Sequence, residues 1–189
     1  MKKLFVMAAM VLSSVGAFAQ YEGGEFTLQP KVGLNCATLT NWDNNEYKAG
    51  LVIGAEAEYH IKNWLGISGG VLYSQQGLKV KDVDTKMKLD YVNVPILANF
   101  YVAKGLALKA GLQPGFLVNA KVGDLDIKDA CEKFDLSVPV GISYEYAGFC
   151  LDARYNVGTT KVFKGDTEDY DKSSKNEVFQ LTIGYKFHL

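Results

Sequence analysis

The sequence is poor in the residues on which small stapled or metal-bound proteins depend. Its 189 residues include only 3 cysteines, 2 histidines and 4 prolines. Three scattered cysteines are too few for a disulfide framework or a cysteine-based zinc site. An excess of one charge is also missing, because 20 Lys and Arg stand against 21 Asp and Glu. This balance excludes the basic surface typical of a nucleic-acid binder, so no nucleic-acid partner is expected.

Long apolar runs are absent after the first 19 residues. A membrane-spanning helix needs about 20 consecutive, mostly apolar residues. A helical membrane protein is therefore excluded. A membrane β-barrel is not excluded, because its apolar residues alternate with polar ones and cancel in an average.

Residues 1–19 have the layout of a cleavable signal peptide. Lys2 and Lys3 form the positive start, residues 4–15 are mostly apolar, and residues 17–19 read Ala-Phe-Ala, a small-residue cleavage pattern. We expect cleavage between Ala19 and Gln20, which makes residues 20–189 the mature domain. The apolar stretch is too short for a membrane anchor, and no cysteine follows the cleavage site as in a lipoprotein.

Period-two alternation dominates the rest of the chain. Leu151, Ala153 and Tyr155, for example, alternate with Asp152 and Arg154. Such alternation predicts β-strands with one apolar and one polar face. Each run is about as long as a tilted strand needs to cross a bilayer, roughly 9–11 residues. Eight runs occur, at residues 26–36, 49–60, 65–76, 91–101, 106–119, 134–146, 149–158 and 179–189.

The connections between these runs are alternately short and long. Tight turns are expected at residues 62–63, 103–105 and 147–148, and long polar loops at 40–48, 77–88, 120–133 and 159–176. This is the layout of outer-membrane barrels. We therefore predict an all-β fold, an eight-stranded antiparallel up-and-down transmembrane β-barrel in the cell outer membrane. Both termini would lie on the periplasmic, short-turn side.

Aromatic residues indicate which face of each strand meets lipid. On the apolar face they gather at both strand ends, with aliphatic residues between them. Two aromatic girdles around an aliphatic belt match two membrane interfaces. A soluble lipocalin-like barrel, whose apolar face lines a ligand cavity, gives no reason for this sorting. The two sets are Tyr59, Phe100, Tyr144, Tyr146, Phe149, Tyr185 and Phe187 near the short turns, and Tyr73, Phe116, Phe134, Tyr155 and Phe179 near the long loops.

The opposite, polar face would line the barrel interior. Its charges must pair there, because an unpaired buried charge costs several kcal/mol. An eight-stranded barrel is just wide enough to be filled by side chains, so we expect a closed, polar-filled interior and no wide pore. The predicted interior polar network has five acids and four bases: Lys31, Glu56, Glu58, Lys109, Asp135, Glu145, Asp152, Arg154 and Lys186.

Two features resist the simple alternation. Proline lacks the ladder donor and is unusual inside strands, so we expect β-bulges or nearby strand ends where prolines occur. In addition, Met87, Leu89 and Tyr91 carry the apolar residues on odd positions before the apolar face moves to even ones. All four prolines fall inside predicted strands: Pro30, Pro95, Pro114 and Pro139.

Three strand motifs resemble the PorT-like family of small outer-membrane β-barrels. Residues 89–95, Leu-Asp-Tyr-Val-Asn-Val-Pro, are similar to its Y-x-x-V-P strand. Residues 73–77, Tyr-Ser-Gln-Gln-Gly, are similar to its third strand, and residues 151–158, Leu-Asp-Ala-Arg-Tyr-Asn-Val-Gly, to its R-Y-x-x-G strand. The resemblance spans essentially the whole mature chain. It implies a role in envelope structure, in host or surface interaction, or in protein export across the outer membrane.

The last strand is similar to the terminal signal that the barrel-insertion machinery reads. In residues 182–189 a polar residue and Gly184 precede Phe187 and Leu189, two apolar residues two positions apart. The final residue is Leu instead of Phe. The resemblance implies that the insertion machinery and outer-membrane lipid are partners.

No catalytic, cofactor or metal site is predicted. A hydrolase needs a nucleophile with a histidine and a carboxylate. His60 and His188 are both expected inside, near the periplasmic end, with Glu58 beside His60 on the same face. The outer-leaflet lipid that such an enzyme attacks lies at the opposite end, so an enzymatic role is not expected.

The loop carboxylates do not have the spacing of a calcium site. The acidic stretch lacks the glycine and the terminal glutamate of an EF-hand. We interpret these residues as solvated loop residues: Asp166, Glu168, Asp169 and Asp171, and likewise Asp124, Asp126 and Asp129.

The cysteines are expected far apart. Cys36 falls on the lipid face near the outer end, Cys131 in a long loop, and Cys150 near a periplasmic turn. Cys150 is then too distant to bridge to the others. Pairing between Cys36 and Cys131 after loop motion is left open.

The sequence therefore predicts a structural or interaction protein that presents four surface loops on a closed barrel, without a cofactor. Surface or export-complex proteins are the partners that the family resemblance implies. Two alternatives stay open. One is a narrow porin-like channel for small solutes, and the other is a soluble periplasmic lipocalin-like ligand-binding barrel.

Overall fold

The computed structural model describes residues 21–40, 45–80, 86–123, 125–162 and 174–189. The predicted signal peptide and its cleavage point between Ala19 and Gln20 lie outside these residues, as do Asp124 and the acidic stretch at 166–171. Within the described ranges, no helix is long and apolar enough to cross a membrane.

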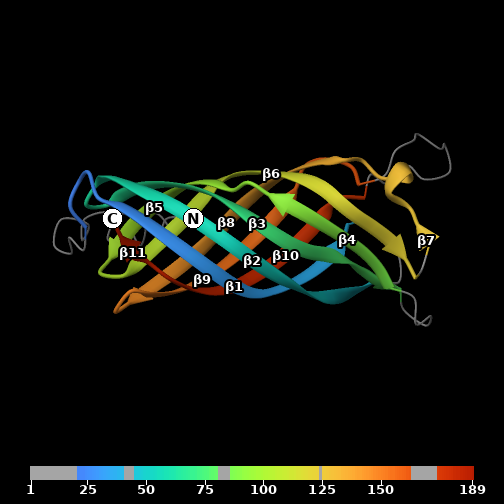
Figure 1. Cartoon of the computed structure of the whole chain (residues 1–189), viewed down its shortest axis with the longest axis horizontal. Helices are drawn as coiled ribbons and strands as arrows, with labels where there is room; N and C mark the ends of the chain where they lie inside the picture. Colours follow the sequence, from blue (N-terminus) through green and yellow to red (C-terminus); the bar gives the residue numbers. More distant parts are fainter. Residues whose placement is uncertain (1–20, 41–44, 81–85, 124, 163–173) are drawn as a thin grey trace, which may run out of the picture.

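The strands form one closed antiparallel barrel (Figure 1). Each of the eight barrel strands, which we call staves, pairs with the next one along the chain. In the described part of the chain the eight staves are β1 (Phe26–Leu39), β2 (Asn45–Lys62), β3 (Leu65–Val80), β4 (Lys86–Asn93) continued by β5 (Ile96–Ala103), β6 (Leu106–Val122), β8 (Phe134–Tyr146), β9 (Phe149–Gly158), and β10 (Asn176–Tyr185) continued by β11 (Phe187–His188). The ring closes where β1 pairs with β10 and β11. This confirms the predicted eight-stranded up-and-down architecture.

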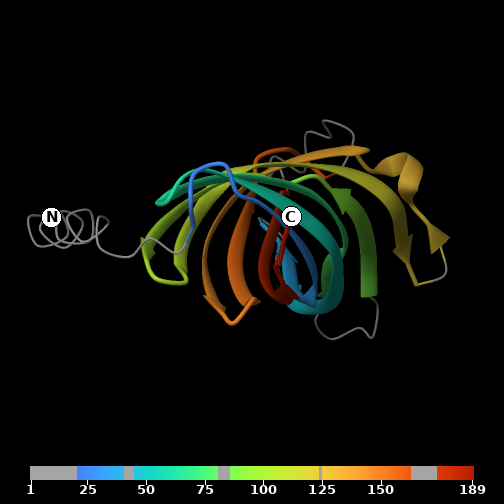
Figure 2. The ribbon, with the colours of Figure 1, turned by 60° about the vertical axis from the view of Figure 1, so that its left-hand side comes forward.

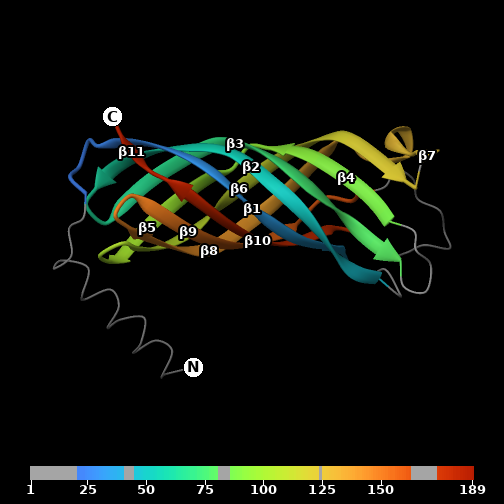
Figure 3. The same ribbon diagram turned by 60° about the horizontal axis from the view of Figure 1, so that its bottom comes forward.

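The two ends of the barrel differ (Figure 3). The three tight turns and the C-terminus lie at one end, which we call the short-turn end. Ala147 and Gly148 both have positive φ, 51° and 82°, the mirror-image turn that suits the twist of a hairpin. The opposite end, which we call the loop end, carries the longer connections. Two further elements lie there, β7 (Leu125–Asp126), which folds back on β6, and the 3-10 helix η1 (Lys128–Ala130).

Strands at the loop end are longer than the sequence predicted. β2 begins at Asn45, β3 ends at Val80, β4 begins at Lys86 and β6 ends at Val122, all inside segments expected to be loops. Backbone pairing continues there although the apolar alternation has stopped, because side chains beyond the bilayer no longer need an apolar face. The hydrophobic pattern marks the membrane-crossing part of each strand and underestimates the ladder.

The apolar face of the barrel points outward and the polar face points inward. Leu34 on β1 is 62% exposed and Leu181 on β10 is 43% exposed, whereas Arg154 on β9 is 1% exposed. The outward aromatics include Tyr59, Tyr144 and Phe187 near the short turns and Phe116, Phe134 and Phe179 toward the loop end. This orientation contradicts the lipocalin-like alternative. Figure 2 shows the curved wall of strands around the interior.

The prolines interrupt ladders without shifting their register. Pro95 separates β4 from β5, yet both pair with β3 in one continuous register. Pro30 lies in the gap between the β1–β10 and β1–β11 ladders, and Pro139 lies in a gap of the β6–β8 ladder. Pro114 lies opposite the β4–β5 break, and its carbonyl accepts from Val94 N–H at 2.8 Å. The expected bulges at prolines are therefore wrong, while the expected strand end is right for Pro95.

The interior toward the loop end contains an apolar cluster, which corrects the expectation of a barrel filled only by polar groups. Tyr91, Leu89 and Met87 point inward on β4, whose pleat does not switch faces. They pack with residues from β1, β3 and β6 and with two residues of the long connections. This apolar plug consists of Leu39, Leu78, Met87, Leu89, Tyr91, Leu117, Ala120, Cys131 and Val162. The interior therefore has two zones, an ionic one and an apolar one.

The three cysteines all lie in the described part of the chain and form no disulfide there. Cys36 is exposed on the outer face of β1, whereas Cys131 is fully buried in the apolar plug and Cys150 is buried on β9. Because Cys36 and Cys131 lie on opposite faces of the barrel wall, no bridge joins them in this conformation.

Candidate functional site: an ion-pair network inside the barrel

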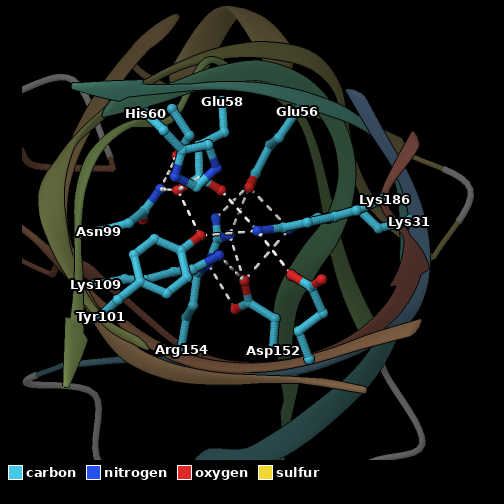
Figure 4. Close-up of polar contacts among 12 residues, drawn as sticks. Lys31, Glu56, Glu58, His60, Asn99, Tyr101, Lys109, Asp152, Arg154 and Lys186 are labelled. Carbon is cyan, nitrogen blue, oxygen red and sulfur yellow. Dashed lines mark hydrogen bonds and ion pairs between the residues drawn. The ribbon is translucent and has the colours of Figure 1, made fainter. Parts of the chain in front are cut away.

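A central ion cluster crosses the barrel interior. The guanidinium of Arg154 donates two parallel hydrogen bonds to Glu56, at 2.6 and 2.7 Å, and two to Asp152, at 2.7 and 2.6 Å. Lys31 Nζ lies 2.8 Å from Glu56 Oε2 and 3.4 Å from Asp152 Oδ2, and Lys109 Nζ lies 2.9 Å from Asp152 Oδ2. Figure 4 shows these side chains pointing toward one another from the surrounding wall. Strands β1, β2, β6 and β9 are thus tied together across the lumen.

Small residues next to the cluster give its long side chains room. A Cβ added at Gly70 would lie 2.6 Å from Glu56 Cγ, and one added at Gly141 would lie 2.9 Å from Arg154 Cγ. Both approaches are closer than real Cβ atoms show. The glycines on the inner face of β3 and β8 therefore let Glu56 and Arg154 lie flat across a narrow lumen.

A second ion cluster lies nearer the short-turn end. Lys186 Nζ lies 2.8 Å from Glu58 Oε2 and 3.2 Å from Glu145 Oε2, and it donates to Tyr101 Oη at 2.9 Å. Tyr101 in turn donates to Glu58 Oε1 at 2.7 Å, and Asn99 Nδ2 donates to the same oxygen at 2.8 Å. One lysine thus bridges carboxylates from β2 and β8, with neutral donors completing the shell.

Tyr21 closes the short-turn end of the interior. It precedes β1, is 1% exposed, and its hydroxyl donates to Glu145 and accepts from Lys186 at 3.3 Å. Its ring stacks on His60 with centroids 3.7 Å apart. Burial, reinforced by the hydrogen bond to Glu145, raises the pKa of Tyr21 above its ordinary value, so the phenol stays protonated and acts as donor. Sequence reasoning missed Tyr21, because a single aromatic before the first strand belongs to no periodic pattern.

The two histidines have different surroundings at the short-turn end. His60 is fully buried, and its Nε2 lies 3.9 Å from Glu58 Oε1. His188, also expected inside, lies at the rim on the inner side, where its ring centroid is 5.9 Å from that of Tyr21, but its side chain is exposed. The side chain is not enclosed because β11 ends at His188. Within the described residues, no group of three or more His, Cys, Asp or Glu is placed to hold a metal ion.

Eight of the nine predicted interior residues meet in the two clusters. Asp135 does not join them. It lies toward the loop end, where it accepts from Thr160 Oγ1 at 3.0 Å and from Asn176 Nδ2 at 3.2 Å. Without Asp135 the charges balance, with four acids and four bases. The two clusters together are therefore balanced in charge and paired internally.

Comparison with known proteins places this architecture among outer-membrane barrels. The profile of the family described as outer membrane protein beta-barrel domain matches residues 18–164. A crystal structure of Ail, the attachment invasion locus protein of Yersinia pestis, in complex with the heparin analogue sucrose octasulfate, is 18% identical. The TM-score is 0.56, and the match covers 87% of this chain and 99% of that one.

A second similar solved structure is the crystal structure of Neisserial surface protein A. It is 22% identical with a TM-score of 0.53, and the match covers 86% of this chain and 97% of that one. At these identities the likeness shows the shared fold alone. A search of curated proteins finds no match.

Proposed function

The chain belongs to the outer membrane protein β-barrel domain family, and from this premise we propose that it is a closed barrel whose role is carried by its loop end. It is an integral protein of the cell outer membrane that presents surface loops on a β-barrel. The proposal adds that it is neither an enzyme nor a channel. Its work is to hold the loop end in place as a contact surface for another molecule.

The observation that carries the proposal is the ion cluster that fills the lumen. Arg154 and Asp152 on β9 meet Glu56 on β2 through the lumen, with exposures of 3% or less. Tyr21 covers one end of this zone and the apolar plug fills the other. A solute passing through would have to separate buried ion pairs, and removing one partner from such a pair costs about 3–5 kcal/mol. This favours an anchor over the narrow porin-like channel.

The proposed orientation puts both termini and the short turns in the periplasm. It is supported by the position of the tight turns and the C-terminus at one end, which is the outer-membrane layout (Figure 3). The last strand supports recognition by the barrel-insertion machinery. Ile183, Tyr185 and Phe187 form one outward apolar row, 39–52% exposed, that reaches the end of the chain.

The finer assignment to PorT-like barrels is also part of the proposal. Its motifs occupy places where the fold needs them. Arg154 of the R-Y-x-x-G strand is the centre of the ion network, and Pro95 of the Y-x-x-V-P strand separates β4 from β5. Partners at the cell surface or in an export complex would then contact the loop end.

Conductance separates the anchor from the channel. Full-length mature protein is reconstituted in planar bilayers, and the anchor predicts no persistent open steps above the protein-free bilayer. Persistent steps from the unaltered protein would contradict the closed barrel and favour transport. A porin treated in the same way provides the positive control.

Labelling of intact cells tests the orientation. Leu125→Cys at the loop end and Tyr146→Cys at a short turn are a matched pair, since the native side chains are 69% and 74% exposed. The three native cysteines are first replaced by alanine. A membrane-impermeant maleimide should label Leu125→Cys in intact cells and Tyr146→Cys only after the outer membrane is permeabilised. The reverse pattern would refute the orientation.

A further inference from the structure

Two lysines lie directly opposite each other on the outer wall at the loop end. Lys88 on β4 pairs with Lys121 on β6, and both side chains are exposed. Their neighbours Leu89 and Ala120 are buried in the apolar plug, so the lysines point outward. A β-bulge in β6, where Leu117 and Asn119 face consecutive residues of β4, brings the two lysines into register.

This pairing is unfavourable by itself. Like charges directly opposite in an antiparallel pair repel, because their Cβ atoms are only about 4.5–5.5 Å apart. Asp126, across from Lys121 on β7, is the nearest exposed carboxylate in the ladder, and its Oδ1 already accepts from Lys128 N–H at 2.9 Å. Lys128 adds a third cation, and its Nζ lies 2.9 Å from the Val118 carbonyl oxygen. Lys88 and Lys121 thus face each other in the described β4–β6 ladder, and the carboxylate across from Lys121 on β7 already accepts a backbone hydrogen bond.

The lysines stand just beyond the apolar belt. On β6 the outward Phe116 and Val118 are 50% and 41% exposed, and Lys121 follows three residues later. At about 3.4 Å per residue this is roughly 10 Å along a tilted strand. Between belt and lysines, Asp90 is buried and accepts from Asn119 Nδ2 at 2.9 Å. The wall therefore changes from apolar to paired polar to cationic over the distance in which a bilayer changes from acyl chains to headgroups.

We infer that Lys88 and Lys121 bind a headgroup phosphate of an anionic glycolipid in the leaflet that surrounds the loop end. A phosphate between the two ammonium groups converts their repulsion into two charge-assisted hydrogen bonds. Lysine suits this position because its stem lies along apolar surface while its charge reaches the headgroups. The identity of the leaflet as the outer one rests on the proposed orientation, whereas phosphate binding by the lysine pair does not.

The test is a titration of the full-length mature protein in neutral detergent with bisphosphorylated lipid A, followed by native mass spectrometry of the adducts. The double variant K88Q/K121Q is compared with K62Q/K104Q, which removes two exposed lysines at the short-turn end. A basic residue near an anionic headgroup contributes roughly fivefold in affinity, so K88Q/K121Q should bind roughly 25-fold more weakly. K62Q/K104Q should bind as the unaltered protein does.

Two further arms identify the source of the phosphate. With dephosphorylated lipid A, K88Q/K121Q and K62Q/K104Q should bind equally well. Inorganic phosphate at millimolar concentration should not displace lipid A from the unaltered protein. Displacement by inorganic phosphate would show a free-anion site instead. Equal binding by K88Q/K121Q and the unaltered protein, or an equal loss in K62Q/K104Q, would overturn the inference.

Folding of the variants is checked by heat-modifiable mobility. Without lipid A, K88Q/K121Q should be as stable as the unaltered protein or more stable, because the substitution removes a repulsion. With lipid A the order should reverse. A reversal together with labelling of the short turns in intact cells would keep the phosphate site and refute the orientation, so the two claims fail separately.

Discussion

Arg154 on β9 and Glu56 on β2 are joined by two parallel hydrogen bonds of 2.6 and 2.7 Å across the barrel interior. The two strands are not neighbours in the sheet, so this contact is made through the lumen and not along the wall. The same guanidinium also grips Asp152, two residues away on its own strand. The pair therefore links strands that are not neighbours in the barrel. The stability lost when either partner is substituted depends on the charges that remain around it.

Removing the acid should cost more than removing the base. Glu56→Gln leaves Lys31, Lys109 and Arg154 around Asp152, three cations with one carboxylate, and should lower the free energy of unfolding by about 3–5 kcal/mol. Arg154→Met leaves two lysines with two carboxylates and should cost about 1–3 kcal/mol for the unmade hydrogen bonds. Urea unfolding in lipid vesicles, read by heat-modifiable mobility, measures both. An equal or reversed order would contradict this charge balance.

Tyr21 should stabilise the barrel in a pH-dependent way. Tyr21→Phe removes the donor to Glu145 and should cost about 1 kcal/mol at pH 8. The folded pKa of Tyr21 is raised by burial, while in the unfolded chain the phenol ionises near pH 10. The contribution of Tyr21 is therefore fully present below pH 10 and is lost as the pH rises above it.

The check for Tyr21 is a pair of unfolding series at several alkaline pH values. The stability difference between the unaltered protein and Tyr21→Phe should be constant from pH 7 to 9 and should shrink above about pH 10. Comparing the two proteins cancels the other tyrosines and the lysines. A difference that grows with pH would show that Tyr21 is not held as a protonated donor.

The apolar plug should behave as a packed protein core. Leu78 is fully buried in the plug, and Leu78→Ala should cost about 2–5 kcal/mol because a cavity remains. Leu34 faces lipid and is 62% exposed, so Leu34→Ala should cost only about 1–2 kcal/mol, since acyl chains fill the space. The same vesicle unfolding assay compares them. A larger loss of unfolding free energy for Leu34→Ala than for Leu78→Ala would contradict a packed core inside the barrel.

The cysteines should resist oxidation to an internal bridge. Cys36 is on the outer face of β1 and Cys131 is buried in the plug. Treatment of the folded protein with copper–phenanthroline should therefore not lower its mass by the two hydrogens that a disulfide removes. Oxidation after unfolding in urea is the control, because any two cysteines can come into contact in the unfolded chain. A bridge formed in the folded protein would mean that the loop end rearranges enough to bring Cys131 outside.

The strand positions could be predicted where turns and alternation agree. β8 and β9 have the predicted bounds because Ala147 and Gly148 mark a tight turn and the alternation is unbroken on both sides. The inward placement of Glu56 and Arg154 follows from the same alternation, since a strand period of two sends every second side chain to one face. The loop-end extensions of β2 and β6 could not be predicted, because backbone pairing leaves no apolar pattern outside the bilayer.

The parts of the interior that were missed depend on tertiary contacts. Tyr21 and Cys131 come from segments without any period, and only the closed barrel gives them a place to bury. Asp135 shares the alternation of the network residues, but the height of a side chain in a barrel depends on strand stagger, which composition does not reveal. Pro30 keeps its register because the ladder opens at Gln29 and Pro30 and then resumes in the same register.

The most direct test of an apolar wall around an ionic lumen is a nitroxide scan along β9 of the protein in lipid vesicles. Spin labels replace residues 151–157 one at a time in a background with the three native cysteines changed to alanine. Collision with oxygen, which concentrates in the bilayer, should be high at 151, 153, 155 and 157 and low at 152, 154 and 156. A flat profile, or high oxygen contact at 152 and 154, would contradict the outward apolar face and the inward ionic one.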